Sequence, residues 1–482
     1  MSQKSSYSFG TMCFCRLIGL VFLIAFLSFW VQMEGLIGEQ GIVPTHQYLS
    51  QLSKLSPWDR FSKVPTLLWL DSSELSIHLV CALGCLSSLL LFMWITPRLM
   101  AFFCWGFYLS LFTSTQSFLS FQWDILLLEC GFLTILASPW KARIPRASPL
   151  MYWLLWIVLF KLMFSSGVVK LTSMDPNWKN LSAMQYHYFT QPLPNPLSWF
   201  FHQFPSWLQE LSTLFMFHIE LLVPFLLFTT PRIRAIGAAL LALLQILILV
   251  SGNYAYFNLL SIILCAPCIT DHYWPQSWVF AKAPKPISCG TSTPARVLKG
   301  TLCSFFILYN FYLFMLLFAP MRSFIPRGLH EVHQAMRPFC LVNSYGLFAT
   351  MTTKRPEILV QGSEDGRVWK DYGFTYKPGD LSRMPSQVAP HQPRLDWQMW
   401  FAALRPDYRY VPWFQKFALR LLEGSESVLA LVETNPFPGK PPKWIRAVVY
   451  EYEFTSIRER SETGNWWKRK PLKIFLPPAT LQ

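Results

Sequence analysis

Charged residues are scarce in this 482-residue chain: Asp, Glu, Lys and Arg make up 14% of it, whereas soluble globular proteins contain roughly 25%. The deficit is confined to the first two thirds. Residues 1–320 contain 29 charged residues, against 38 in the 162 residues that follow. The first block therefore lacks the polar surface that a soluble domain needs. This composition excludes a single soluble domain and also a disordered or fibrous chain.

Cysteine is nearly absent from the second block, because only Cys340 follows residue 320. No disulfide can form within 321–482, so we expect a hydrophobic core to hold that block together. Cys265-Ala266-Pro267-Cys268 has redox spacing, but it ends an apolar stretch and is interpreted as two small hydrophobes. His330 and His333 lack the four-residue spacing of helical metal ligands, and no phosphate-binding glycine loop occurs. We predict neither a metal nor a cofactor.

Apolar stretches dominate the first block. A helix needs about 20 mostly apolar residues to cross a bilayer core of roughly 30 Å. The candidates are residues 13–32, 75–96, 99–119, 123–138, 150–170, 209–228, 235–251, 254–270 and 301–320. The sequence thus predicts a multi-pass transmembrane domain over 1–320, with about nine helices, and a separate domain over 321–482.

The net charge of +15 comes from dispersed cations, which does not favour nucleic-acid binding. With the N-terminus in the cytoplasm, the predicted inside segments hold twelve Lys and Arg residues and the outside loops hold four. This is the asymmetry of the positive-inside rule. An odd number of crossings then places the second block on the exoplasmic side. The membrane would be that of the endoplasmic reticulum in a eukaryote and the inner membrane in a bacterium.

Two predicted outside loops are long. Residues 33–74 mix glycine, proline and charge, and we expect a small extramembrane cap. Residues 172–208 are rich in proline and aromatics, which predicts an ordered loop on the membrane. At headgroup depth we expect Trp178, Tyr186, Tyr188, Trp199 and Trp207. Asn180 begins an N-glycosylation sequon, which equally fits a chance match that is never modified.

The second block changes to short runs of β-branched and aromatic residues separated by Gly and Pro. Strands are predicted over 341–350, 357–361, 368–376, 444–454 and 473–476, and helices over 397–404 and 413–423. Gly362–Gly366 is interpreted as a hairpin turn. The fold class is thus an α-helical polytopic membrane domain followed by a β-rich, β-sandwich-like soluble domain with short helices.

Five ionisable residues are predicted within or beside the bilayer: Asp124, Glu129, Lys161, Lys170 and Glu220. Each costs about 2.5–3.5 kcal/mol at a helix centre on insertion scales, so they need partners. With three acids and two bases, they can form buried ion pairs that fix helix packing. A desolvated lysine can also act as a base, so a catalytic role stays open.

Residues 394–401 form the best recognition candidate in the second block. Arg394, Asp396, Trp397, Trp400 and Phe401 combine charge with large apolar area, which is typical of protein-binding patches. The same string also fits a domain core that contains an internal salt bridge. With Tyr186 and Trp199, these residues are our candidates for binding a client.

Several long strings together resemble the lipase maturation factor family over nearly the whole chain. They are Phe121–Glu129, Lys161–Leu171, Tyr186–Tyr188, Gln191–Pro194, Ile219–Phe225, Gly252–Tyr254, Leu341–Gly346, Trp369–Tyr372, Lys377–Gly379, His391–Phe401 and Asn435–Phe437. The chain is similar to compact, bacterial-like members, since little follows Pro477-Pro478 and no lumenal retention signal ends it. The membrane block is distantly similar to vitamin K-dependent carboxylase.

The resemblance implies a membrane-embedded factor that assists folding, assembly and export of secreted proteins, with lipases as partners. We expect binding without covalent chemistry, and so no enzyme. The alternative is a carboxylase-like membrane enzyme that modifies a peptide or lipid through the charged residues. Transport is a third possibility, which the lack of a clear inverted repeat weakens.

Overall fold

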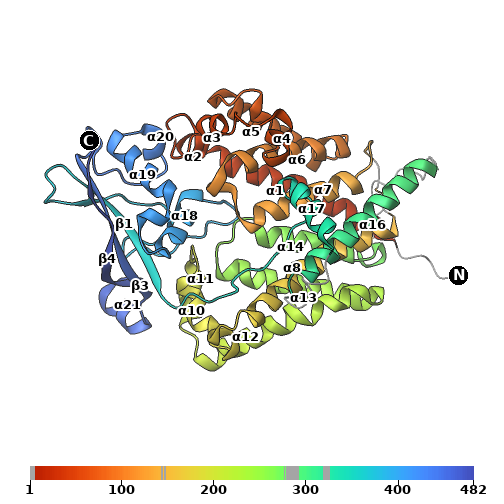
Figure 1. Ribbon diagram of the computed structural model, residues 1–482. Coiled ribbons are helices and arrows are strands. Elements are labelled where there is room, and N and C mark those ends of the chain that lie inside the picture. Colours follow the sequence, from red (N-terminus) through yellow and green to blue (C-terminus); the bar gives the residue numbers. More distant parts are fainter. Residues whose placement is uncertain are drawn as a thin grey trace.

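The computed structural model describes residues 6–142, 145, 148–275, 277, 293–318 and 326–481. Helices of the first 318 residues form an elongated bundle, and a region containing a small sheet lies at one end of it (Figure 1). The first helix begins at the bundle end that is remote from the sheet (Figure 1). The predicted helical domain followed by a β-containing domain with short helices is confirmed.

Each of the nine predicted apolar stretches forms a helix. The bundle helices are α1 (Ser8–Trp30), α5 (Glu74–Phe92), α6 (Pro97–Ser114), α7 (Gln122–Ala137), α8 (Pro149–Thr172), α12 (Ser206–Leu221), α13 (Pro231–Ser251), α14 (Phe257–Cys265) and α16 (Thr293–Met315). Helix α12 continues into the 3-10 turn η3 (Val223–Phe228), and α14 continues into η4 (Ala266–Cys268). Six are long and apolar enough to cross a membrane: α1, α5, α8, α12 with η3, α13 and α16. The chain is therefore a multi-pass membrane protein, and the count of nine crossings stays a prediction.

The helix starts follow directly from local sequence. Helices α6, α8 and α13 each begin with a proline, whose missing N–H would have no partner in the first turn. At the start of α5, the Ser73 side chain accepts a hydrogen bond from the backbone N–H of Ser76. The Ser148 hydroxyl does the same for Met151 in α8.

The predicted cap over residues 33–74 is an ordered helical segment. It contains α2 (Met33–Ile37), α3 (Thr45–Gln51), α4 (Pro57–Lys63) and η1 (Leu67–Trp69). Gly35 of α2 lies against the backbone of Ser427 so closely that a Cβ would stand 2.3 Å from its carbonyl oxygen. Only glycine allows this approach, through which the cap contacts the C-terminal region.

The 172–208 segment folds into α9 (Pro176–Lys179), α10 (Ala183–Thr190) and α11 (Pro196–His202). Trp199 does not lie at headgroup depth as predicted. It is buried and donates its indole N–H to the carbonyl of Thr455 at 3.0 Å. Trp400 likewise donates to the carbonyl of Thr190 at 2.9 Å. The segment packs against the C-terminal region because these indoles find buried acceptors there. Trp178 and Tyr188 are buried as well, whereas Trp207, 63% exposed, has the surface position that was expected.

The sheet has four antiparallel strands in the order β2-β1-β3-β4: β1 (Arg355–Ser363), β2 (Lys370–Asp371), β3 (Trp444–Phe454) and β4 (Trp467–Ala479). Ile358 pairs with Val449 near the middle of the central register. The surrounding helices are α17 (Arg327–Met336), α18 (Arg394–Ala403), α19 (Pro412–Glu423), α20 (Glu426–Leu429) and α21 (Ile457–Thr463). Short 3-10 turns are η2 (Gln116–Leu119), η5 (Asp271–Tyr273), η7 (Arg337–Phe339) and η8 (Tyr408–Tyr410). Helices α18 and α19 pack on β1 and β3, where a sandwich would place a second sheet.

Two strand predictions differ from the structure. Within the strand predicted over 368–376, only β2 (Lys370–Asp371) forms. Residues 341–350 form no strand, although their alternating pattern suggested one. Their backbone groups bond to side chains of α7 instead. The N–H of Asn343 donates to Glu129 at 3.0 Å, and the N–H of Gly346 donates to Gln122 at 3.2 Å. The alternation reflects an extended segment lying along a helix.

The helical bundle and the C-terminal region share one hydrophobic core. Buried residues of α7, such as Leu126, and of α18, such as Leu395, belong to the same cluster. The predicted boundary between residues 320 and 321 falls outside the described residues, so the division into 1–320 and 321–482 stays a prediction. Of the predicted inside cations, Lys4, Arg143, Arg146, Lys282 and Lys285 also lie outside them.

Candidate functional site

The five predicted intramembrane charges all have partners of opposite sign. Lys161 of α8 donates to Glu129 of α7 at 2.8 Å and to the amide oxygen of Asn310 in α16 at 2.6 Å. Glu129 also accepts from the hydroxyl of Tyr345 at 2.6 Å. Both members of the ion pair are buried. This network joins three bundle helices to the 341–350 segment.

Lys170 and Glu220 form a second buried pair, which joins α8 to α12. The Lys170 ammonium donates to both carboxylate oxygens, at 2.8 and 2.7 Å. It also lies 5.5 Å from the centroid of the Trp178 ring, a distance at which a cation is attracted to the ring face. Lys161 and Lys170 therefore face different neighbours, as their nine-residue separation on one helix predicts.

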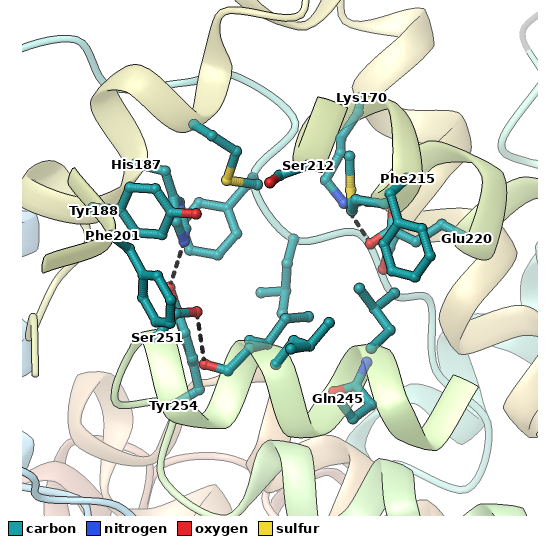
Figure 2. A pocket seen from close by; sticks show the side chains of 18 of the residues that line it. Lys170, His187, Tyr188, Phe201, Ser212, Phe215, Glu220, Gln245, Ser251 and Tyr254 are labelled. Atoms are coloured by element: carbon teal, nitrogen blue, oxygen red, sulfur yellow. Dashed lines mark hydrogen bonds and ion pairs between the residues drawn. The ribbon is translucent and has the colours of Figure 1, made fainter. Parts of the chain in front are cut away.

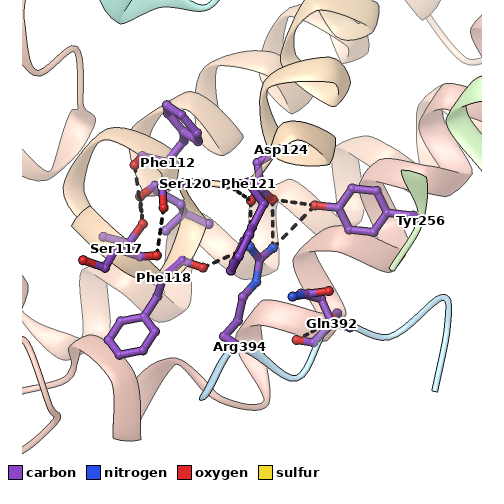
Figure 3. A network of polar contacts seen from close by, with 12 residues as sticks. Phe112, Ser117, Phe118, Ser120, Phe121, Asp124, Tyr256, Gln392 and Arg394 are labelled. Carbon is purple, nitrogen blue, oxygen red and sulfur yellow. Dashed lines mark hydrogen bonds and ion pairs between the residues drawn. The ribbon is translucent and has the colours of Figure 1, made fainter. Parts of the chain in front are cut away.

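Asp124 takes its partner from the C-terminal region. Arg394, the first residue of α18, donates to its two carboxylate oxygens at 2.7 and 2.9 Å (Figure 3). The hydroxyls of Tyr108 in α6 and Tyr256 beside α14 donate to the same carboxylate at 2.6 and 2.7 Å. Arg394 also donates to the carbonyl of Phe118 at 3.0 Å. Both charges are completely buried, so this bidentate pair connects the two regions where water has no access.

A further charged cluster ties the sheet to the 172–208 segment. Arg355 of β1 donates to the backbone carbonyls of Phe189, Gln191 and Pro192. Its guanidinium lies 2.7 Å from Glu357, and Lys377 lies 3.0 Å from the same carboxylate. Sequence reasoning did not find this cluster, because strand residues of an extramembrane domain carry no insertion cost that would draw attention to them.

The predicted client-binding residues divide into buried and accessible ones. Arg394, Asp396, Trp397 and Trp400 are buried, which corrects the prediction that they form a recognition surface. The reason is that each contacts the bundle or the surrounding core, and Arg394 pairs with Asp124 rather than with Asp396. Trp199 is also buried, whereas Tyr186 is half-buried and Phe401 is 40% exposed.

A cavity of about 500 Å³ lies between α8, α10, α12 and α13 (Figure 2). Its walls are mainly Leu, Phe, Met and Ile side chains. The Lys170–Glu220 pair lies on one side, and His187 and Tyr254 lie on another (Figure 2). Phe348 of the C-terminal region contributes to the wall and packs edge-on against His187, with ring centroids 5.1 Å apart. The volume is in the range of ligand pockets.

His187 is a titratable residue of the cavity wall that lies outside the membrane spans. Burial, with a smaller effect of the nearby Lys170 ammonium, lowers its pKa to about 4. The ring is therefore neutral at physiological pH. Its Nε2 lies 3.1 Å from the hydroxyl of Tyr254, which itself donates to the side-chain oxygen of Gln191 at 2.7 Å.

Metal ligation has one partial candidate among the described residues. The ligand atoms of Glu34, Glu74 and His78 lie within 4.8 Å of one another. However, Trp30 donates to Nδ1 of His78 at 2.7 Å, and Nε2 of His78 lies 3.1 Å from Glu34. Because an acceptor at Nδ1 makes Nε2 the protonated nitrogen, this tautomer has no lone pair left for a metal. His333 contacts the hydroxyl of Tyr309 at 2.7 Å instead of a ligand partner.

The geometry defines a multi-pass membrane protein whose C-terminal region is joined to the helical bundle through buried ion pairs. Residues 10–276 match the family model described as lipase maturation factor transmembrane domain. Residues 341–477 match the lipase maturation factor C-terminal domain. The chain belongs to the lipase maturation factor family.

Curated relatives match along nearly the whole chain. Lipase maturation factor 2 of Xenopus laevis is 35% identical over 96% of this chain and 81% of its own length. The Homo sapiens protein of the same name is 33% identical over 97% and 82%. Lipase maturation factor 1 of Mus musculus is 32% identical over 97% and 86%. No solved structure matches the chain.

Replacement of Lys161 by Met tests whether the intramembrane pairs are structural. We expect the free energy of unfolding to fall by about 3–5 kcal/mol, because Glu129 stays buried without its counter-ion. Combining it with Glu129→Gln should recover much of this loss. Arg383→Met is the control, since the Arg383–Glu433 pair is 39% and 42% exposed and should contribute about 0–1 kcal/mol. Unfolding would be followed in mixed micelles of increasing denaturing detergent. Equal effects of Lys161→Met and Arg383→Met would contradict the structural role.

The buried Asp396 carboxyl predicts that the stability of the protein depends on pH. Burial raises its pKa to about 6, although the N–H groups of Tyr376 and Lys377 donate to its Oδ1 at 3.0 and 2.8 Å. The folded state thus holds the proton more tightly than the unfolded state, whose pKa is about 3.9. Relative to Asp396→Asn, which keeps an Oδ1 acceptor, the wild type should lose about 2–3 kcal/mol as pH rises from 4 to 6. Thermal unfolding midpoints across this range measure the difference, and parallel curves would refute it.

Proposed function

We propose that the protein assists maturation of exported lipases by binding the client while it folds, without covalent chemistry. The family supports the client class, since relatives that align along nearly the whole chain are named lipase maturation factors. The ion pairing of the two intramembrane lysines supports a mechanism without covalent chemistry. Lys161 and Lys170, the side chains that a membrane enzyme would use as bases, are each held in a buried ion pair.

We assign the client-binding surface to the exposed end of α18. Phe401 and Leu404 are 40% and 41% exposed. Because they are three residues apart on a helix, their side chains lie on the same face. The other side of this helix is buried against the bundle, so the helix presents its apolar residues from a fixed position.

We further propose that the N-terminus is cytoplasmic and the C-terminal region exoplasmic. Two observations support this orientation: the excess of Lys and Arg in the predicted inside segments, and the position of the sheet at the bundle end remote from the start of α1 (Figure 1). Such a location, in the endoplasmic reticulum or the bacterial inner membrane, brings the C-terminal region to exported proteins.

One observation favours the enzyme alternative. The Lys170–Glu220 pair lines a cavity, where charged groups could act on a bound molecule. A carboxylase-like reaction would leave a mass increase on exported proteins that is lost with Lys170→Met. Binding alone leaves the client mass unchanged.

The client-binding assignment predicts a loss of lipase output. Cells that lack the protein and express a secreted lipase should release several-fold less active lipase, and the wild-type chain should restore it. Phe401→Asp combined with Leu404→Asp should fail to restore it, because charge on the patch opposes apolar contact with the client. Val368→Asp is the matched control, since Val368 is 64% exposed in the same region but distant in sequence from α18.

The readout is secreted lipase activity normalised to the membrane level of each variant. Restoration by the double variant would refute the assigned surface. Unchanged lipase secretion without the protein would refute the proposed function itself.

The proposed orientation of the protein in the membrane can be tested with reporter fusions at its C-terminal end. A reporter that fluoresces only in the cytosol is fused after Leu481, and a second fusion carries an exoplasmic enzyme such as alkaline phosphatase at the same place. We expect enzyme activity and no fluorescence. Fluorescence from the first fusion would reverse the topology and prevent contact between the C-terminal region and exported lipases.

A further inference from the structure

We propose that the cavity between α8, α10, α12 and α13 binds an uncharged, single-chain amphiphile whose head group carries hydroxyl donors, such as a monoacylglycerol. This inference does not depend on the lipase client. It rests on where the cavity opens, what lines it, and which hydrogen-bonding groups remain available in it.

The mouth of the cavity faces the hydrocarbon. Among the lining residues, Phe204, Leu211, Phe215 and Leu247 are 42%, 52%, 39% and 43% exposed. The first three lie on α12 or just before it, and the fourth lies on α13. Both helices are membrane spans, so an opening between them leads sideways into lipid. A ligand that enters there arrives from the bilayer, which selects for an apolar chain.

The interior suits such a chain. Leu162, Leu208, Leu244, Ile248 and Phe257 line it, and Figure 2 shows a central space surrounded by the labelled side chains. An alkyl chain removed from water or interface into these walls gains about 0.8 kcal/mol per buried methylene in hydrophobic transfer. A molecule taken from the bilayer gains less, so the polar groups must supply the selectivity.

The polar groups of the cavity carry no net charge. Lys170 and Glu220 neutralise each other, and His187 is neutral. A charged head group would be buried without a counter-ion, because the Lys170 ammonium already donates twice to Glu220. This argues against a fatty-acid anion.

The remaining hydrogen-bonding capacity includes both donors and acceptors. The hydroxyl of Tyr188 lines the cavity and has no hydrogen-bond partner among the described residues, and the Lys170 ammonium has a third N–H beyond the two that bind Glu220. The hydroxyls of Ser212 and Ser251 donate to the carbonyls of Leu208 and Ile248. Their oxygens can therefore still accept. Since Tyr254 donates to Gln191, its oxygen accepts from Nε2 of neutral His187, which leaves Nδ1 as an acceptor. Among the described residues, Nδ1 of His187 has no hydrogen-bond partner. A head group that matches these sites must both donate and accept, which hydroxyls do, whereas a carboxylate can only accept.

The test uses the full chain in lipid nanodiscs and three photoreactive probes with the same chain: a monoacylglycerol, a fatty acid at pH 8 and a lysophosphatidylcholine. We expect saturable labelling of α12 and α13 peptides by the monoacylglycerol, competed by unlabelled monooleoylglycerol and at least fivefold above the other two probes. Leu247→Trp should reduce this labelling at least fivefold by filling the mouth. Ile246→Trp is the matched control, since Ile246 is 45% exposed on the same helix but does not line the cavity.

Each outcome is informative. Equal labelling by all three probes would show that the alkyl chain alone is recognised and would overturn the head-group argument. Loss of labelling with His187→Phe at an unchanged unfolding midpoint would support it. Absence of saturable labelling, or equal effects of Leu247→Trp and Ile246→Trp, would overturn the site.

Discussion

The bidentate pair between Arg394 and Asp124 is the interaction on which the arrangement of the two regions depends. Both side chains are completely inaccessible to water. Burying either charge alone would cost several kcal/mol after relaxation, so neither region can bury its own member without the other. The buried carboxylate of Asp124 in the helical bundle therefore has its counter-ion only when α18 is in place. Tyr108 and Tyr256 satisfy the remaining acceptor capacity of the carboxylate, which makes four segments converge on one group.

Buried polar groups are also shared elsewhere along the interface between the bundle and the C-terminal region. Glu129 is shared between Lys161 inside the bundle and Tyr345 from the C-terminal region. Arg355 reaches from the sheet to the backbone carbonyls of the 172–208 segment. This interface also contributes to the cavity, since Phe348 of the C-terminal region lies against His187 in the wall. The charge network and the cavity thus join the bundle and the C-terminal region in one packed body.

Predictions from the sequence were most successful where the membrane imposes a free-energy cost on a residue. Apolar stretches long enough for the bilayer became helices, and the five charges within them proved to be paired, because an unpaired charge there opposes insertion. The β3 strand followed from an alternating pattern, and the helix predicted over 413–423 corresponds to α19. For β3 and α19 the structure thus agrees with the local sequence pattern.

The failures have a common cause, which is that the decisive partner is distant in sequence. Arg394 lies 270 residues from Asp124, and no periodicity connects them. The alternation of 341–350 indicated a strand because it cannot reveal that the neighbour is a helix. Trp397 and Trp400 resembled a binding patch, since a string of aromatics is the same whether another protein or the chain itself covers it. The sequence did not indicate the cavity, because residues from distant parts of the chain, from α8 to the 341–350 segment, form its wall.

The most direct test of this account is a double-mutant cycle on the central pair. Arg394→Met, Asp124→Leu and the combined variant are compared with wild type for the free energy of unfolding in mixed micelles. The account predicts that each single change costs about 3–5 kcal/mol and that the combined variant costs at least 2 kcal/mol less than their sum. Additive effects within about 0.5 kcal/mol would show that the two charges do not depend on each other and would contradict it.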